Sequence, residues 1–146
     1  MKFNRYPKRD AIRNYFPLPN EIFCLGLTGG EILVYSYLMF CEDRKTFQCH
    51  PSYRTIGNAI GKSKNSVKKY VAGLENKRLI TTEPTEIFTK SGQKHNGNLL
   101  YTVRPIEEAK QYYFEQQMRK AEQESARQRT LKRLEEYDRE QKRKAV

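Results

Sequence analysis

Cysteine is scarce in this sequence, and the apolar runs are short. The three cysteines, Cys24, Cys41 and Cys49, are an odd number without the spacing of a disulfide framework. No signal peptide is expected, because the first residues are basic and aromatic instead of forming an apolar run. Reduced thiols in a cytoplasmic protein are the simplest account. The longest apolar run, residues 32–40, is too short to span a bilayer, so we expect no membrane-spanning segment.

Acidic side chains are few in the first two-thirds of the chain. Residues 1–106 contain 17 Lys and Arg against 8 Asp and Glu, whereas residues 107–146 contain 11 against 9. The net charge of +11 favours a polyanionic partner, because Lys and Arg that neutralise phosphates release condensed counterions. Nucleic acid is therefore the first candidate, ahead of an anionic membrane surface, and its binding face is expected in the N-terminal part.

Combinations of residues that carry catalysis are also missing. The acidic residues Glu75, Glu83 and Glu86 are scattered and do not suggest a pair of catalytic carboxylates. No spacing of serine and histidine suggests a nucleophile with its base. Residues 57–63 resemble a phosphate-binding P-loop only superficially, because the spacing is one residue short and a helical pattern precedes it. We therefore expect no enzymatic activity.

A metal site is not expected either. Cys41, Cys49, His50 and the distant His95 could be combined into a zinc site, but they lack the closely spaced ligand pairs of such sites. Structural thiols and surface histidines are the preferred interpretation. No metal and no cofactor is predicted.

Composition divides the chain into three segments. Residues 1–20 form a basic arm that leads into a short extended segment, because five Lys and Arg stand among aromatic residues and prolines discourage helix. Residues 21–104 carry the periodic patterns of a folded domain. Residues 105–146 lack glycine and, after Pro105, proline. They predict one charged helix of up to about 38 residues, roughly 57 Å long.

The first helix of the domain is predicted over residues 29–41. Thr28 can cap its N-terminus, and Glu31 stands three residues later, as in a capping box. Apolar residues then recur at helical spacing. They are Ile32, Tyr35, Leu38 and Met39.

Two short helices separated by a glycine turn follow. Ser52 can cap the second helix, and Gly61 ends it. Ser63 caps a third helix, residues 63–76, with one apolar and one basic face. We expect Gly57 to let the two helices cross closely and Gly61 to adopt a positive φ. The apolar face of the third helix consists of Val67, Tyr70, Val71 and Leu74.

The pattern changes toward a period of two after the third helix. Residues 79–82, 87–89 and 99–103 are rich in β-branched and apolar residues and predict strands. Between them, residues 90–97 contain the turn signals Ser91-Gly92 and Asn96-Gly97. The prediction is a hairpin with a long basic tip.

Residues 51–80, PSYRTIGNAIGKSKNSVKKYVAGLENKRLI, resemble the helix-turn-helix of the winged-helix superfamily, especially its small phage- and plasmid-type domains from Gram-positive bacteria. Gly57 departs from the family, which prefers alanine there. The resemblance implies a mainly α fold with a small antiparallel β-hairpin, namely a winged helix-turn-helix DNA-binding domain over residues 21–104, followed by the long charged helix. The matching positions are Ile56, Gly57, Gly61, Ser63, Val67, Tyr70 and Leu74 to Ile80.

Residues 15–23, YFPLPNEIF, also look like the N-terminal domain of plasmid replication-initiator A proteins and phage replisome organisers. Those proteins bind replication origins. The resemblance therefore implies replication initiation as one role, and transcriptional regulation of a mobile element is the other.

The resemblance also assigns the residues that would contact double-stranded DNA. In a helix-turn-helix the second helix lies in the major groove, with its first residues toward the base edges. Asn can pair with adenine, Lys can reach guanine acceptors, and Lys69 is assigned to a phosphate. The predicted base readers are Lys64, Asn65, Ser66 and Lys68. Together with Ser63 and Lys69 they make up the predicted DNA-binding residues of this helix. The wing at residues 90–97 is expected to contact the DNA backbone through Lys90, Lys94, His95 and Asn96.

Several alternatives stay open at this stage. The basic helix face could be a solvated surface, and the hairpin tip a mobile loop. Leu131, Leu134 and Tyr137 could support a homodimer, or the tail could be a solvated helix held by pairs such as Glu135–Arg139. The chain could also be a protein–protein adaptor that uses both the winged helix and the long helix as interaction surfaces.

Overall fold

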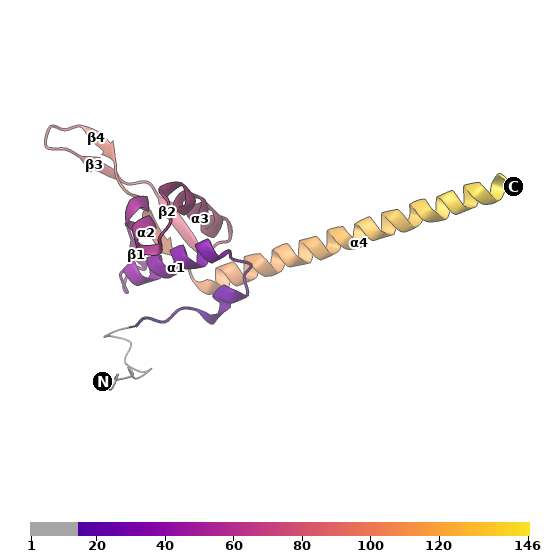
Figure 1. Ribbon diagram of the computed structural model, residues 1–146, viewed down its shortest axis with the longest axis horizontal. Helices are drawn as coiled ribbons and strands as arrows, with labels where there is room; N and C mark the ends of the chain where they lie inside the picture. The colour runs from indigo at the N-terminus through magenta and orange to yellow at the C-terminus, as the bar shows by residue number, and fades with distance from the viewer. Residues whose placement is uncertain (1–14) are drawn as a thin grey trace. The chain divides into compact units, whose positions relative to one another are not determined.

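The computed structural model describes residues 15–146 (Figure 1). The chain divides into two compact units, residues 1–110 and 111–146. The predicted fold class is confirmed: the chain is mainly α with a small antiparallel sheet and a long C-terminal helix. Of the predicted basic arm, residues 1–20, positions 1–14 lie outside the described residues.

The elements follow one another in a simple order. A 3-10 helix, η1, precedes the first α-helix at a point where the sequence predicted only an extended segment. The elements are η1 (Asn20–Phe23), α1 (Gly29–Cys41), β1 (Gln48–Cys49), α2 (Tyr53–Ile60), α3 (Lys64–Asn76), β2 (Ile80–Glu83), β3 (Glu86–Phe88), β4 (Lys94–Asn96), β5 (Leu100–Val103) and α4 (Ile106–Lys144).

Helix α1 begins at the predicted capping box. The Thr28 hydroxyl accepts a hydrogen bond from the Glu31 amide at 3.2 Å, and the Thr28 amide donates to Glu31 Oε1 at 3.0 Å. Two orphan amides of the first turn are satisfied in this way. Tyr35 and Leu38 are buried as predicted, whereas Ile32 and Met39 are only half-buried.

The α2–turn–α3 segment follows the sequence prediction closely. The Ser52 and Ser63 hydroxyls accept hydrogen bonds from the amides of Thr55 and Ser66, and each caps its helix. Gly61 ends α2 with φ of 71°, in the left-handed region that a side chain disfavours.

Gly57 lies close to the partner helix, and the turn that follows it adds a tighter constraint than the one predicted. A Cβ on Gly57 would lie 2.5 Å from the carbonyl oxygen of Lys62. The Lys62 amide donates to the Gly57 carbonyl at 2.9 Å, so the turn backbone folds back over the glycine. The added Cβ would also lie 3.5 Å from Val67 Cγ2 of α3, an ordinary contact, so the turn excludes a side chain more strictly than the partner helix does.

One apolar core joins the helices to the sheet. Each fully buried aliphatic side chain contributes roughly 1.5–3 kcal/mol relative to exposure. Tyr70, predicted on the apolar face of the third helix, is only half-buried, and so is Val103. The largest core side chains with less than 2% exposure are Ile22, Val34, Tyr35, Leu38, Ile56, Val67, Leu74, Leu79, Ile80 and Tyr101.

The strands form two separate sheets (Figure 1). The first is antiparallel and has the order β1-β5-β2. Tyr101 of the central strand β5 therefore pairs with Cys49 of β1 on one side and with Thr82 of β2 on the other. The sequence predicted no strand at β1. The second sheet is the ribbon β3–β4, inserted between β2 and β5. This ribbon replaces the expected long loop, because Lys94–Asn96 form a strand.

Helix α4 is 39 residues long, close to the predicted length. Every residue from 117 to 146 is exposed. One alternative was a solvated helix stabilised by charge pairs such as Glu135–Arg139. The structure describes all of residues 111–146, and these two side chains form no ion pair there. No helix within residues 15–146 combines the length and the apolar character needed to cross a membrane.

Candidate nucleic-acid interface

The exposed face of α3 follows from the residues that the helix buries. Val67, Val71 and Leu74 turn toward the core, where α3 packs against α1 and α2. At about 100° per residue, Asn65, Lys69 and Ala72 point away from that core, and Lys64 and Lys68 flank them on one side. All five residues are exposed and form the exposed face of α3.

Three of the predicted readers have free polar groups. Among the residues that the structure describes, none forms a hydrogen bond or ion pair with the side chains of Lys64, Asn65 or Lys68. Their donors and acceptors are therefore available to a ligand. The small side chain of Ala72 lies at the centre of the same face and leaves room for a surface to approach.

Ser63 and Ser66 are engaged within the helix start. The Ser63 hydroxyl accepts from the Ser66 amide at 3.2 Å and donates to the Ser66 hydroxyl at 3.0 Å. Ser66 can still donate its own hydroxyl hydrogen, since a hydroxyl is both donor and acceptor. Ser63 thus fixes the helix start, and Ser66 keeps one free donor.

An ion pair fastens the far end of α3 to the start of α1. Lys77 Nζ lies 2.7 Å from Glu31 Oε1 and also donates to the Gly26 carbonyl at 3.0 Å. Burial raises the pKa of Glu31, but hydrogen bonds from Lys77 and Thr28 and the charge of Lys77 outweigh it, so the pKa is lowered. The sequence predicted only a capping role for Glu31 and did not indicate this pair.

A pocket of about 450 Å³ lies beside that ion pair, between α1 and α3. Lys69 and Tyr70 contribute to its wall together with Glu31 and Lys77. The Tyr70 ring covers Gly30 so closely that a Cβ there would overlap it. Lys69 therefore lies at the α1 side of the exposed face, apart from the first turn of α3, which suits a contact to phosphate more than one to a base.

The wing residues lie on the β3–β4 ribbon. Its register places Glu86 opposite Asn96, Ile87 opposite His95, and Phe88 opposite Lys94. All six residues are exposed. Lys90 belongs to the turn that joins the strands, and Lys94 Nζ lies 2.8 Å from Glu86 Oε1.

Three hydrogen bonds fix the base of the ribbon. The Gly97 amide donates to the Thr85 carbonyl at 2.8 Å, and the Thr85 hydroxyl donates to the Asn98 carbonyl. The Asn98 side chain donates to the His50 carbonyl at 3.2 Å. The ribbon is thereby tied to the end of β1, although its two strands bury no side chain.

Two exposed cations near α3 were not predicted as site residues. Arg54 lies on α2, and Lys62 lies in the turn. In residues 51–80 there are seven Lys and Arg and one acidic residue, Glu75. The rule that the first helix of the motif crosses the DNA backbone could have indicated both.

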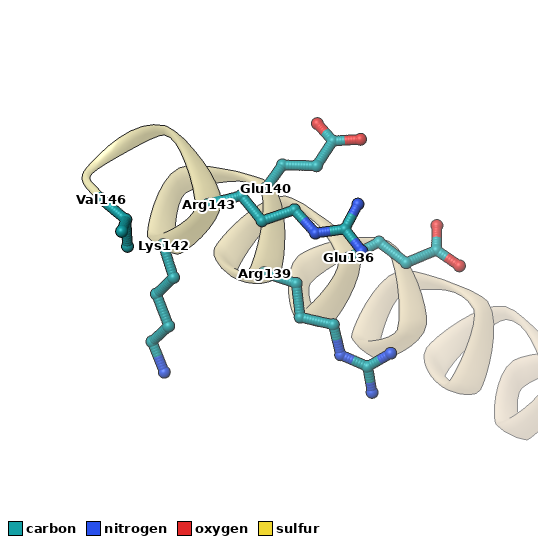
Figure 2. Close-up of a pocket in the computed structure, with 6 residues that line it drawn as sticks. All are labelled: Glu136, Arg139, Glu140, Lys142, Arg143 and Val146. Carbon is teal, nitrogen blue, oxygen red and sulfur yellow. The ribbon is translucent and has the colours of Figure 1, made fainter.

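Within the described part of the chain, no three His, Cys, Asp or Glu side chains are grouped so as to hold a metal. The Cys49 thiol is buried, and burial raises its pKa to about 12, so it is protonated and unreactive at neutral pH. A hollow near the end of α4 is lined only by exposed side chains of the last turns, including Arg139, Glu140 and Lys142 (Figure 2).

In comparison with known proteins, the middle of the chain is similar to a helix-turn-helix domain. Residues 25–80, which contain α1, α2 and α3, match the family model of a helix-turn-helix domain. No curated protein sequence matches the chain. One similar solved structure carries the description "Possible transcriptional regulator from Methanosarcina mazei Go1". It is 17% identical, with a TM-score of 0.48, and the match covers 70% of this chain and 81% of that one.

Proposed function

We propose that this chain binds double-stranded DNA, with the first turns of α3 in the major groove and the β3–β4 ribbon on the backbone. One observation carries the proposal. In a segment that matches a helix-turn-helix domain, the exposed face of α3 presents Lys64, Asn65 and Lys68 without partners among the described residues.

The arrangement suits major-groove reading. A major groove about 12 Å wide admits one α-helix, and base edges there present distinct donor and acceptor patterns. Asn65 can pair bidentately with adenine, and Lys64 and Lys68 can reach the N7 and O6 acceptors of guanine. The caps at Ser52 and Ser63 and the Lys77–Glu31 pair hold α3 in place, so less order has to be gained on binding.

Phosphate contacts would supply much of the affinity. Lys69, Arg54 and Lys62 surround the reading face, and Lys90, Lys94, His95 and Asn96 lie on the ribbon. Contacts of this kind position a protein on the duplex without reading its sequence. The excess of basic residues in this part of the chain fits such a role.

As the biological role we propose control of transcription by occupancy of an operator, in a mobile element such as a phage or plasmid. Replication initiation is the second candidate, and it rests on the resemblance of residues 15–23 to origin-binding proteins. Selection of bound duplexes from a random pool separates the two. An inverted repeat would support an operator, and an array of direct repeats would support an origin.

Salt dependence of binding tests the DNA proposal itself. For the selected duplex, the logarithm of the association constant should fall linearly with log salt, with a slope of about −0.9 per neutralised phosphate. Changing both Lys90 and Lys94 to Ala should weaken all duplexes similarly and reduce that slope by about one to two units. Lys132→Ala, in α4, is the control that removes a cation outside the proposed interface.

The outcome that contradicts the proposal is also defined. A chain that shows no shift of any duplex at about 50 mM salt, but retains a protein partner in a salt-insensitive manner, would be the protein–protein adaptor. If the salt slope is unchanged in the Lys90 and Lys94 variant, the ribbon does not contact DNA, and the proposed interface is limited to α3.

A further inference from the structure

We propose that Phe88 is a wedge that enters the minor groove beside the α3 site, unstacks one base step and bends the duplex. This inference rests on the proposed function and adds an activity to it, the deformation of DNA. Strand β3 exposes two large apolar side chains, Ile87 and Phe88.

The exposure of these side chains is not explained by folding. Phe88 is 69% exposed and Ile87 is 56% exposed, on a strand whose three residues are all on the surface. The ribbon buries no side chain of its own and pairs with no strand of the first sheet. Neither side chain contributes to a core, so each is available to a binding partner.

The two apolar residues lie on opposite faces of the ribbon, because side chains alternate along a strand. Ile87 shares its face with His95 and packs against Gly97, where an added Cβ would lie 3.1 Å from Ile87 Cγ1. Phe88 lies directly opposite Lys94 and has the greater exposure. Phe88 is therefore the side chain that is free to leave the ribbon surface and insert.

The charges around Phe88 favour DNA over an apolar protein partner. From residue 88 to the end of β4 the chain contains Lys90, Lys94 and His95 and no acidic residue. Glu86, on the same face as Phe88, lies 2.8 Å from Lys94, and the two charges offset each other. Lys90, two residues after Phe88, remains as an exposed cation, and an aromatic ring next to a positive charge matches the stacked bases and flanking phosphates of a duplex.

Insertion of apolar side chains is an established way to bend DNA from the minor groove. Such wedges partially unstack a base step and kink the duplex by about 20–90° toward the major groove. Flexible pyrimidine–purine steps are deformed most easily, so a wedge also selects sequence at positions without base contacts. Phe88 would thus give preference for TA or CA/TG steps at the position that the ribbon reaches.

The test uses the full chain and the duplex selected by it. Bending is measured by energy transfer between dyes at the two ends, and unstacking by 2-aminopurine placed in the step under the ribbon. The chain has no tryptophan, so protein emission does not obscure the probe. The unaltered chain should bend the duplex by at least about 20° and raise the 2-aminopurine fluorescence.

The Phe88→Ala variant should neither bend the bound duplex nor raise the 2-aminopurine fluorescence. Its affinity should fall by no more than about tenfold, because the phosphate contacts remain. Phe88→Leu should keep part of the bend. Ile87→Ala is the matched control on the opposite face and should bend DNA as the unaltered chain does. Circular dichroism melts should coincide for all variants, since both side chains are mostly exposed.

The outcomes separate this inference from the proposed function. A chain that binds no duplex overturns both. If the selected duplex is bound, and is bent equally by the unaltered chain and by the Phe88→Ala variant, only the wedge is overturned. Loss of the bend in the Ile87 variant but not in the Phe88 variant also overturns it.

Discussion

Asn65 faces solvent from the first turn of α3, where base edges would be read. Asn65→Ala should cost roughly 1–3 kcal/mol of binding free energy on the selected duplex and much less on random DNA, as expected for a base contact. Fluorescence anisotropy with both duplexes measures the difference. Asn76→Ala, at the other end of the same helix, is the matched control. Equal losses on both duplexes would make Asn65 a positioning residue.

Glu42 is a buried acid directly after α1. Burial raises the pKa of its carboxyl, and Arg44, 3.6 Å away, offsets this only in part. An acid whose pKa is higher in the folded state stabilises the fold when protonated, and this contribution is lost as pH rises from the unfolded to the folded pKa. Glu42 is therefore unfavourable for stability at neutral pH.

Glu42→Gln should raise the Tm at pH 7, because the neutral amide avoids burial of a charge. The gain should shrink as pH falls toward the pKa of an unfolded glutamate, where the native carboxyl is itself protonated. Thermal melts between pH 3.5 and pH 7 measure this dependence. Glu122→Gln, exposed on α4, should show no such trend. A gain that is constant with pH would rule out the electrostatic explanation.

The position of α3 against α1 depends on the Lys77–Glu31 ion pair. Lys77→Met would leave the Glu31 carboxylate buried with no cation and should cost about 1–3 kcal/mol of unfolding free energy. The lowered pKa of Glu31 means that its contribution is present above the unfolded pKa and is lost as pH falls through the folded one. The loss in the Lys77 variant should therefore be smaller at low pH.

Urea unfolding at pH 7 and pH 3.5 checks this prediction. Adding Glu31→Gln to Lys77→Met should recover part of the loss, since the charge is then removed together with its partner. Lys69→Met, on the same helix without a partner among the described residues, is the matched control. Equal losses for Lys69 and Lys77 would mean that the ion pair does not stabilise the fold.

The two compact units of the whole molecule differ in what they need to fold. Core side chains such as Leu38, Ile56, Val67 and Leu74 all precede residue 111, and residues 117–146 are fully exposed. Removal of residues 115–146 should therefore leave a domain that melts cooperatively. Thermal unfolding followed by circular dichroism checks this. An unfolded product would mean that the tail completes the core.

We propose a homodimer held by α4 as the use of this long helix. Leu131 and Leu134 are 50% and 56% exposed and would be covered in such a dimer. Sedimentation of the full chain should give a dimer, and the truncated chain a monomer that loses more affinity for two half-sites than for one. A monomer at both lengths would contradict the dimer.

Local chemistry in the sequence determined the helices and their boundaries. Thr28, Ser52 and Ser63 cap α1, α2 and α3 as predicted, and Gly61 takes the positive φ that ends α2. Each of these signals acts between residues at most four positions apart, so the chain shows it without tertiary structure. The exposed polar face of α3 follows from the same local period.

Tertiary structure alone decided the features that join distant residues. β1 is a strand only because it pairs with β5, with Gln48 opposite Thr102, and Glu31 meets Lys77 from 46 positions away. A two-residue strand and a single lysine carry no periodic pattern. The second strand of the ribbon, Lys94–Asn96, likewise depends on pairing with β3, because an isolated three-residue run has too few local contacts to define a strand.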